Sequence, residues 1–329
     1  MANQTEVLRL LMAAAPKYQS GDQLATTLNI SRTAIWKLVR GLQNAGYSIE
    51  SRHGRGYRYV ENNQLSAAVI EDGLDLKRPV KLVVLPQVDS TNAYLKRLVA
   101  EQPLAQPTVV IADQQTAGYG RSGRPFYSPS KTGIYMSIGL PIGPSEPLDA
   151  GLLTTGTAVV VAQTLQRLFD VPVELKWVND VLVNHHKVVG IMSEGVTDFE
   201  SGQISSVIVG IGINLTTAAF PESIQYKAGA VLDHPTSVSR NQVIRELIHH
   251  FLTRYPAYRS GAFMDDYRKL SMVIHQRVSL KSGARTYDGI VEDIDAEGAL
   301  VVRLDDATVR HFNSGEITKV HLLTGKYHG

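Results

Sequence analysis

Residues 31–42 read SRTAIWKLVRGL, and this stretch decides the fold of the first part of the chain. Apolar residues recur in it at positions i, i+3, i+4 and i+7: Ile35, Leu38, Val39 and Leu42. This spacing predicts a helix with one buried face. The remaining positions form an outer face that carries Arg32, Thr33, Trp36, Lys37 and Arg40. The predicted helix therefore presents a cationic surface to solvent.

The segments on both sides of this helix predict a winged helix-turn-helix. Upstream, Ser20 and Gln23 have the spacing of a capping box at the start of another helix. Downstream, residues 47–52 and 57–60 form two short β-like runs, and the sequence His-Gly-Arg-Gly between them suits a tight hairpin. We expect a DNA-binding domain over residues 1–63, with three arginines on the wing: Arg52, Arg55 and Arg58. A small helical adaptor with a solvated charged face is the alternative.

The distribution of charge agrees with a module that binds a polyanion. The chain has 329 residues and a formal net charge of +2, yet residues 1–62 contain eight Lys and Arg against four Asp and Glu. An excess of positive charge at one end of a nearly neutral protein is typical of nucleic-acid binding. The chain has no cysteine, which excludes disulfides, thiolate metal sites and a cysteine nucleophile, and favours a cytoplasmic location.

Beyond residue 63 the pattern changes twice. Residues 64–272 show strand patterns that alternate with longer helical patterns, and they predict a central α/β domain. One long helix is expected near residues 150–169. Strands are expected near residues 108–112 and 134–140, on either side of a long loop. Residues 273–329 have only short β-like runs between evenly spaced turns, which predicts a small β-barrel. The expected fold class is α+β with three domains. No apolar run approaches the ~18 residues of a membrane span, so we expect no membrane partner.

Two common kinds of site are excluded by spacing. The pairs His185-His186 and His249-His250 are sequence neighbours, which point apart on a strand or a helix, so we expect no metal site made by the protein alone. Gly210-Ile211-Gly212 begins like a dinucleotide fingerprint, but Leu215 stands where the third glycine belongs. A Rossmann site is not expected.

The loop Gly118-Tyr119-Gly120-Arg121-Ser122-Gly123-Arg124 has the composition of a phosphate cradle. Its glycines free backbone N–H groups to approach an anion, and its two arginines can make bidentate contacts with phosphate. A solvated basic loop has the same composition, so this stretch alone leaves the two interpretations even.

Five short strings occur in an order that resembles the biotin protein ligase family. They are DSTN at 89–92, residues 115–124, KWVND at 176–180, KVVGI at 187–191 and residues 210–214. Together with the winged head and the β-rich tail, they resemble the bifunctional type, the biotin operon repressor that is also a ligase. The resemblance implies a central domain of the class II synthetase-like type and an SH3-like barrel at the C-terminus.

The resemblance implies a reaction in two steps. Biotin reacts with the Mg²⁺ complex of ATP to give biotinyl-5′-AMP and pyrophosphate, and a lysine of a biotin carboxyl carrier protein then takes the biotinyl group. Biotin and Mg-ATP are thus substrates, and no tightly bound prosthetic group is expected. Operator DNA is the second implied partner, bound by a homodimer that forms when the adenylate is present.

The resemblance also implies roles for individual residues. The catalytic group is Lys187, Arg121 and Asp180. The biotin-binding group is Ser90, Thr91, Asn92, Gln115, Tyr119, Gly120, Arg121, Lys187 and Gly190. The group that binds ATP or the adenylate is Gly118, Arg121, Arg124, Phe126, Lys176, Trp177, Asn179 and Asn214. Residues 179 and 180 also suit a simple turn of the chain.

Three positions depart from the usual family pattern: Tyr119 stands where Arg is commonest, Phe126 where Trp is common and Val178 where Pro is usual. Tyr119 removes a possible cation near the biotin carboxylate, so we expect weaker affinity or retention of the adenylate, with activity preserved by Arg121 and Lys187. The alternatives are a DNA-binding biotin sensor with little or no ligase activity and another acyl-adenylate ligase, such as a lipoate ligase. The latter would lack the winged head.

Overall fold

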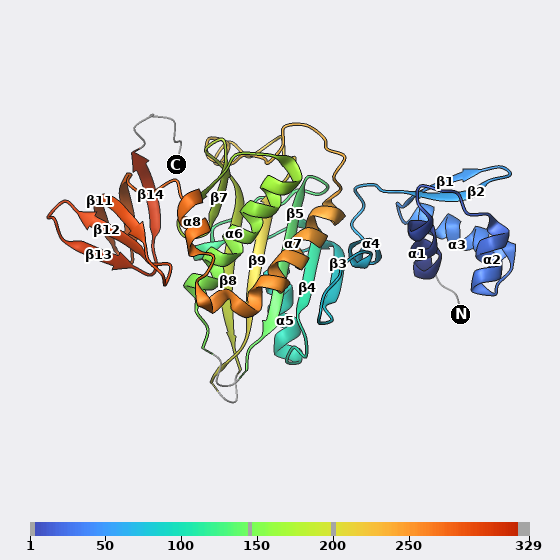
Figure 1. Ribbon diagram of the computed structural model, residues 1–329, viewed down its shortest axis with the longest axis horizontal. Coiled ribbons are helices and arrows are strands. Elements are labelled where there is room, and N and C mark those ends of the chain that lie inside the picture. Colours follow the sequence, from blue (N-terminus) through green and yellow to red (C-terminus); the bar gives the residue numbers. More distant parts are fainter. Residues whose placement is uncertain (1–3, 144–146, 199–201, 322–329) are drawn as a thin grey trace. The chain divides into compact units, whose positions relative to one another are not determined.

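A computed structural model describes residues 4–143, 147–198 and 202–321 of the chain (Figure 1). The outermost residues of the first and third predicted domains, 1–3 and 322–329, lie outside this description. The chain divides into two compact units. Unit 1 contains the residues up to Asp75 together with Ser237–Arg245, and unit 2 contains Leu76–Thr236 and the residues from Glu246 onward.

Unit 1 is a small helical domain with a β-hairpin. Its elements are α1 (Gln4–Ala14), α2 (Gly21–Leu28), α3 (Arg32–Asn44), β1 (Ser48–Arg52), β2 (Gly56–Val60) and α4 (Ala67–Glu71). The strands β1 and β2 pair antiparallel. One apolar core joins the three helices α1–α3 to the hairpin, and it includes Leu11, Leu24, Ile35 and Ile49. The predicted winged helix-turn-helix is confirmed.

The helix boundaries in unit 1 follow the predicted caps. Ser20 Oγ accepts from Gln23 N at 3.1 Å while Gln23 Oε1 accepts from Ser20 N at 3.0 Å, so the capping box is formed. Ser31 Oγ caps α3 by accepting from Ala34 N. Between the two helices Asn29 adopts a left-handed conformation, which ends α2 and turns the chain into α3.

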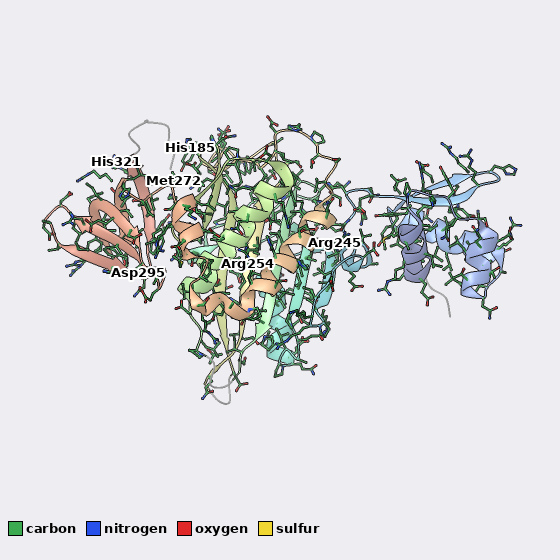
Figure 2. All side chains as sticks on the ribbon, in the orientation of Figure 1. His185, Arg245, Arg254, Met272, Asp295 and His321 are labelled. Atoms are coloured by element: carbon green, nitrogen blue, oxygen red, sulfur yellow. The ribbon has the colours of Figure 1, made fainter. Side chains whose placement is uncertain are left out.

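Residues from the far part of the sequence complete unit 1. Asn241 accepts from Ser66 N and donates to Gln64 O, and Arg245 donates to Val69 O at 2.7 Å. Arg245 is labelled in Figure 2. These bonds saturate backbone groups of the segment that follows the hairpin.

Unit 2 is built on a seven-stranded sheet. The strands are β3 (Lys81–Val88), β4 (Thr108–Gln115), β5 (Gly133–Pro141), β6 (Val173–Lys176), β7 (Asp180–Val183), β8 (His186–Thr197) and β9 (Ile204–Asn214). Their order is β3-β4-β5-β9-β8-β7-β6. Only the pair β3 and β4 is parallel among the described strands of this sheet. Strand β7, which begins at the residues that suit a turn, was not predicted.

Two helices cover opposite faces of the sheet, α5 (Thr91–Glu101) and α6 (Ala150–Phe169). Successive residues of a strand point to opposite faces. In β8, Ser193 contacts Thr154 of α6 at 2.9 Å, whereas the next residue, Glu194, contacts α5. The face that carries Glu194 also carries Gly190, and the helix α5 leaves that end of the face uncovered for the site described below.

The remaining described helices of the chain are the α-helices α7 (Arg240–Arg254) and α8 (Met264–Leu270) and two 3₁₀ helices. The 3₁₀ helices are η1 (Arg121–Gly123), in the basic loop, and η2 (Tyr255–Ser260), which follows α7. The helix predicted near residues 150–169 is confirmed as α6. No helix in the described part of the chain is long and apolar enough to cross a membrane.

All the regular elements of unit 2 described between residues 277 and 321 are β-strands. They are β10 (Arg277–Ser282), β11 (Arg285–Ile294), β12 (Leu300–Leu304), β13 (Val309–Phe312) and β14 (Glu316–His321), in the antiparallel order β13-β12-β11-β10-β14. This agrees with the predicted small β-domain. The strands enclose an apolar core that includes Val278, Val291 and Phe312.

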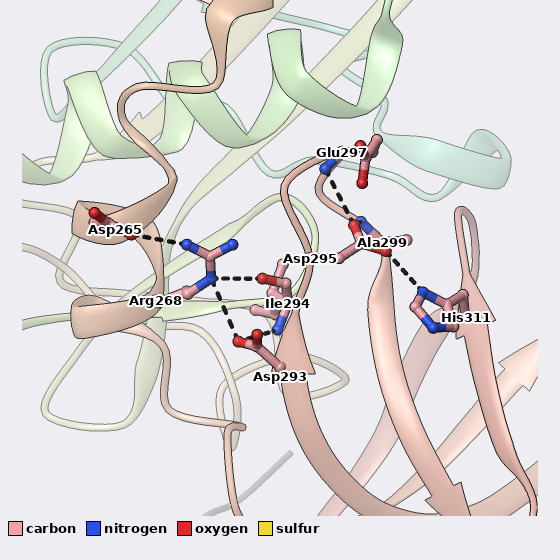
Figure 3. Close-up of polar contacts among 8 residues, drawn as sticks. All are labelled: Asp265, Arg268, Asp293, Ile294, Asp295, Glu297, Ala299 and His311. Atoms are coloured by element: carbon pink, nitrogen blue, oxygen red, sulfur yellow. Dashed lines mark hydrogen bonds and ion pairs between the residues drawn. The ribbon is translucent and has the colours of Figure 1, made fainter.

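Polar contacts fix this β-domain to the central sheet and its helices (Figure 3). Arg268 of α8 donates from Nε to Ile294 O at 2.6 Å and pairs with Asp293 at 3.3 Å. Asp265 of the same helix accepts from Nη1 of Arg268 at 2.8 Å. Asp295 caps the adjoining turn by accepting from Ala299 N. The buried indole of Trp177, which Figure 3 does not draw, donates to Gly298 O at 2.9 Å. The turn at residues 295–298 therefore joins the two parts of unit 2.

Candidate active site and nucleic-acid interface

A cavity of about 470 Å³ lies in unit 2 on the glycine-bearing face of the sheet. It brings together nearly all the ligase residues that the sequence singled out: Ser90, Thr91, Asn92, Gln115, Tyr119, Gly120, Arg121, Arg124, Phe126, Lys176, Trp177, Asn179, Asp180, Lys187 and Gly190. These residues come from α5, β4, the basic loop and strands β6–β8. Two predicted residues, Gly118 and Asn214, do not line the cavity.

One end of the cavity has a floor of buried, uncharged polar groups. Ser90, Thr91 and Asn92, at the N-terminus of α5, are each about 5% exposed or less. Thr91 N donates to Gln115 Oε1 at 2.9 Å, and Gln115 Nε2 donates to Ser128 Oγ at 2.9 Å. Because a backbone N–H can only donate, these bonds settle which end of the Gln115 amide points to Thr91. The floor is thus oriented before any ligand arrives.

Glycines leave the strands beneath this floor without side chains on the cavity side. Gly190 and Gly212 are paired across β8 and β9, and the ring of Phe126 lies over them: a Cβ at Gly212 would be 2.6 Å from Phe126 Cε1. A Cβ at Gly210 would be 2.4 Å from Asn92 Oδ1. The glycines of the sequence 210–212 therefore give a ring and an amide close access to the strand backbone. The rejection of a Rossmann site agrees with this position in the middle of a sheet.

The other end of the cavity is lined by charged side chains. Its lining includes five cations, Arg121, Arg124, Lys176, Lys187 and Lys281, and two carboxylates, Asp180 and Glu316. Lys187 Nζ lies 2.5 Å from Asp180 Oδ1, and Arg124 forms a two-pronged ion pair with Glu316. Arg121 donates to Gly315 O at 3.1 Å. An excess of cations that point at one small space suits a polyphosphate.

The ionisation of two groups at this end is shifted by their neighbours. Burial lowers the pKa of Lys176, an effect that Asp180 opposes and Lys187 reinforces. The hydrogen bonds from Arg124 lower the pKa of Glu316. Both shifts follow from the ordinary rules of desolvation and charge pairing, and they leave Glu316 firmly ionised at neutral pH.

Three of the predicted ligand-binding residues, Trp177, Gly118 and Asn214, also make contacts that stabilise the fold. Trp177 lines the cavity but is only 3% exposed, and its N–H is used by Gly298 O, so it is largely a core residue. Gly118 begins the loop in a closely packed position, where a Cβ would be 2.8 Å from Gln115 Nε2 and from Phe126 O. Asn214 ends β9 and donates from Nδ2 to Gly229 O at 3.1 Å.

The contribution of the C-terminal β-domain to the cavity was not predicted. That domain supplies Lys281, Gly283, Ser314, Gly315, Glu316 and Ile317 to the lining. The available signals were two of the evenly spaced turns of the β-rich tail, at residues 282–283 and 313–315. A single acid on a strand, such as Glu316, has no motif that would mark it as a partner for a loop 192 residues away.

No group of three or more His, Cys, Asp or Glu side chains in the described ranges, 4–143, 147–198 and 202–321, could hold a metal ion. Asp180 and Asn179 at the charged end offer single oxygen ligands. Such ligands suit a Mg²⁺ ion that arrives already bound to phosphates.

In unit 1 the outer face of α3 is exposed as predicted. The side chains of Arg32, Thr33, Trp36, Lys37 and Arg40 all face solvent. Trp36 is 51% exposed, and the Arg40 guanidinium lies 5.5 Å from the centre of its ring. Arg32 pairs with Asp22 at 3.0 Å. The outer face of α3 therefore offers cationic groups and one exposed indole side by side.

The three arginines of the wing differ in their surroundings. Arg52 and Arg55 are exposed, whereas Arg58 is half-buried and donates to Glu50 Oε2 at 2.6 Å. Tyr18 also donates to Glu50, which lowers the pKa of Glu50 together with Arg58 and raises the pKa of Tyr18. Both Arg52 and Arg58 lie over the Tyr18 ring. Arg58 therefore helps to hold the hairpin, and Arg55 lies exposed at its tip.

Comparison with known proteins places these two units in context. Residues 84–214 match the biotin/lipoate A/B protein ligase family, residues 3–58 match a helix-turn-helix domain and residues 273–320 match the biotin protein ligase C-terminal domain. The chain is 30% identical to the bifunctional ligase/repressor BirA of Escherichia coli over 326 residues, which cover 97% of this chain and 98% of that protein. The chain belongs to the bifunctional biotin ligase and repressor family.

Two biotin ligases are also similar to this chain. The chain is 32% identical to the biotin–[acetyl-CoA-carboxylase] ligase of Mycobacterium tuberculosis over 70% of this chain and 85% of that one. The solved structure of the biotin protein ligase from Aquifex aeolicus in complex with biotin and ATP is similar, with a TM-score of 0.61 and 26% identity over 72% of this chain and 97% of that one. The expected family and fold are confirmed.

Proposed function

We propose that this chain joins biotin to ATP in the unit 2 cavity, transfers the biotinyl group to a lysine of a biotin carboxyl carrier protein, and uses the adenylate to control operator binding by unit 1. The observation that carries the proposal is the cavity with a neutral polar floor at one end and a cationic cluster at the other. Biotin has the same division, with an uncharged ureido ring and a carboxylate tail.

The proposed roles follow from this division. Ser90, Thr91, Asn92 and Gln115 bind the ureido ring and the tail, with backbone groups of Tyr119, Gly120 and Gly190. The carboxylate attacks the α-phosphate of Mg-ATP, so two anions must be held together while charge develops on phosphorus. Lys187 and Arg121 stabilise that charge, and Asp180 orients Lys187 and faces the Mg²⁺ of the substrate. Arg124, Lys176 and Asn179 hold the phosphates, beside walls formed by Phe126 and Trp177.

The test of the ligase activity is transfer to a purified carrier domain. With biotin and Mg-ATP, we expect the carrier to gain the mass of one biotinyl group on one lysine. A DNA-binding biotin sensor without ligase activity would leave the carrier unmodified. A lipoate ligase would modify its carrier with lipoate and ignore biotin.

We assign DNA recognition to α3 and DNA-backbone contacts to the wing. Arg32, Thr33, Trp36, Lys37 and Arg40 would enter the major groove, and Arg52 and Arg55 would meet phosphates. Arg58 is assigned to the same contact set, although its bond to Glu50 already uses part of its charge. The proposed functional division is residues 1–63, 64–272 and 273–329, and the proposed partners, ATP and operator DNA, imply a cytoplasmic location.

The wing assignment is tested by the salt dependence of operator binding. Each phosphate contact that is lost should reduce the slope of log K against log salt by about 0.9. We expect Arg55→Ala to have this effect and Arg58→Ala to have a smaller one, because Arg58 is paired. A slope unchanged by Arg55→Ala would remove the wing tip from the interface.

Coupling between the two units is proposed to act through dimerisation. A pair of heads reads two half-sites, so tight operator binding requires two copies of the chain. We expect the chain to be mainly monomeric without ligand and dimeric with the adenylate, with operator affinity ~5- to 150-fold higher in the second state. Sedimentation of both states beside operator titrations tests this. Equal mass and equal affinity in the two states would mean that the two activities are independent.

A further inference from the structure

A charged cluster joins the neutral floor to two residues outside the cavity lining, Lys96 and Glu194. Its centre is Glu194 of β8, which accepts from three residues. Lys96 Nζ lies 2.5 Å from Oε1, Asn92 Nδ2 lies 2.8 Å from Oε2, and the Tyr119 hydroxyl lies 3.4 Å from Oε2. Neither Lys96 nor Glu194 belongs to the motifs that define the site.

The geometry of helix α5 and strand β8 brings the members of this cluster together. Asn92 and Lys96 are four residues apart in α5, so their side chains share one face of the helix. Glu194 shares its face of β8 with Gly190, which lines the cavity, and so it projects toward α5 at the edge of the site. The cluster therefore ties the helix that carries the floor to the strand beneath it.

The carboxylate at the centre needs its cation. The Glu194 side chain is only 18% exposed, and the Lys96 side chain is 39% exposed. Burial lowers the pKa of Lys96, but the bonds to Glu194 and Tyr119 more than reverse this effect, so its pKa is raised. A mostly buried carboxylate that lost its cation would keep only neutral donors, which is costly.

The cluster sets the orientation of the floor. A carboxylate only accepts, so the Asn92 amide must turn its nitrogen toward Glu194 and its oxygen toward Ser137, whose Oγ lies 2.5 Å away. Ser137 in turn lies 2.7 Å from Thr91 Oγ1, and Thr91 N binds Gln115. One continuous series of bonds thus leads from the ion pair to the residues that face the cavity.

The cluster also holds the start of the basic loop. The Lys96 ammonium lies 5.7 Å from the centre of the Tyr119 ring, and the Tyr119 hydroxyl reaches the same carboxylate. Tyr119 offers no charge of its own, and Lys96 supplies a cation beside it from α5. A single ion pair is therefore in contact with the loop on one side and the floor on the other.

We propose that Lys96 is a positioning residue for biotin: through Glu194 it fixes Asn92 and Tyr119, and so presents the floor and the loop in the orientation that binds the ureido ring. The inference rests on the proposed ligase function. It adds to that function a residue that touches no substrate and that acts on the biotin step alone.

The test compares three variants, Lys96→Met, Lys96→Arg and the matched control Lys269→Met. Lys269 is also a helical lysine in an ion pair, with Asp266, but it lies on α8. We expect Lys96→Met to raise the biotin KM at least ~10-fold, as for loss of a hydrogen bond to a charged group, with the ATP KM unchanged. Lys96→Arg should stay within ~3-fold of wild type because it keeps the cation.

A double substitution separates charge from packing. When Lys96→Met is combined with Glu194→Gln, the new amide oxygen at position 194 still accepts from Asn92 and no buried charge is left unpaired. We expect the biotin KM of this double variant to be lower than that of Lys96→Met alone, which is a non-additive result. A double variant worse than the single variant would overturn the charge-based account.

Failure of the inference differs from failure of the proposed function. If Lys96→Met has the same biotin KM as Lys269→Met, or raises the biotin and ATP KM values equally, Lys96 has no positioning role. If wild type releases no pyrophosphate with biotin and ATP, the ligase function is wrong instead. Calorimetric titration of biotin alone, without ATP, then still decides whether Lys96 affects binding.

Discussion

The two ends of the cavity hold their polar groups in different ways. At the end with the neutral floor, where we propose that biotin binds, uncharged side chains are buried and bonded to one another, as in the series Asn92, Ser137 and Thr91. At the charged end, where we propose that the phosphates bind, two of the cations are partly exposed and paired with carboxylates, Lys187 with Asp180 and Arg124 with Glu316. Pre-oriented dipoles suit an uncharged ring, whereas cations in ion pairs can exchange a protein carboxylate for an incoming phosphate. The difference predicts separate effects on the two substrates.

The largest expected effect is at the phosphate end. Lys187→Ala should reduce pyrophosphate release ~10²- to 10³-fold, because it removes a cation aimed at charge that develops in the transition state. The fold should remain intact, since this side chain is 38% exposed. Lys269→Ala, an exposed lysine on α8, serves as the control and should be fully active. If Lys187→Ala releases pyrophosphate at a rate within a few-fold of wild type, the catalytic assignment of Lys187 is wrong.

The next effect concerns the loop between the two ends. Arg121→Gly removes the bond to Gly315 O and a charge beside the adenylate, so the intermediate should escape ~10- to 100-fold faster and label lysines of unrelated proteins. Ser122→Gly is a matched control: Ser122 already has a φ of 57°, so glycine fits there without loss of a cation. If Arg121→Gly labels bystanders no more than Ser122→Gly, the loop does not retain the adenylate.

An intermediate effect is expected at the biotin end. In Gly210→Ala the new Cβ would lie 2.4 Å from Asn92 Oδ1, and overpacking of about 1–3 kcal/mol corresponds to a ~5- to 150-fold higher biotin KM. The ATP KM should not change. Gly195→Ala on the neighbouring strand β8 is the control, because its Cβ would make an ordinary 3.4 Å contact with Ile204 Cδ1. Equal biotin KM values for the two variants would contradict the proposed floor.

The smallest effect is the pH dependence of the Arg124–Glu316 pair. The hydrogen bonds from Arg124 lower the pKa of Glu316 from its ordinary 4.5, so the pair contributes stability above pH 4.5 and loses it as pH falls through the lowered pKa. The side chains are 61% and 40% exposed, so solvent limits the contribution to about 0.5 kcal/mol or less. Thermal unfolding of wild type and Glu316→Gln should differ slightly at pH 7 and converge in acid. A gap that widens in acid would contradict this.

The fold was largely predictable because its signals are local. The capping box at Ser20 and Gln23, the buried stripe of α3 and the apolar pattern of α6 each depend on a few neighbouring residues. Strand β7 was missed because its four residues follow directly on a sequence that also suits a turn. Short strands owe their existence to partners elsewhere in the sheet, here β6 and β8.

The candidate site was predictable only where a motif marked it. Motif residues such as Lys187 and Gln115 do line the cavity. Glu316, Lys281 and Lys96 were missed because each is a single charged residue outside any motif, and Glu316 and Lys96 have partners far away in the sequence. The duties of Gly210 and Gly212 were also hidden, since only the three-dimensional structure reveals which ring or amide lies above a glycine.

The most direct test of the account is whether the cavity makes and keeps an acyl-adenylate. The protein would be incubated with biotin and Mg-ATP, desalted and measured by native mass spectrometry, with pyrophosphate release followed in parallel. We expect one retained molecule with the mass of biotinyl-5′-AMP per chain and biotin-dependent pyrophosphate release, both lost in Lys187→Ala. Wild-type protein that retains only free biotin, or nothing, and releases no pyrophosphate would contradict the account.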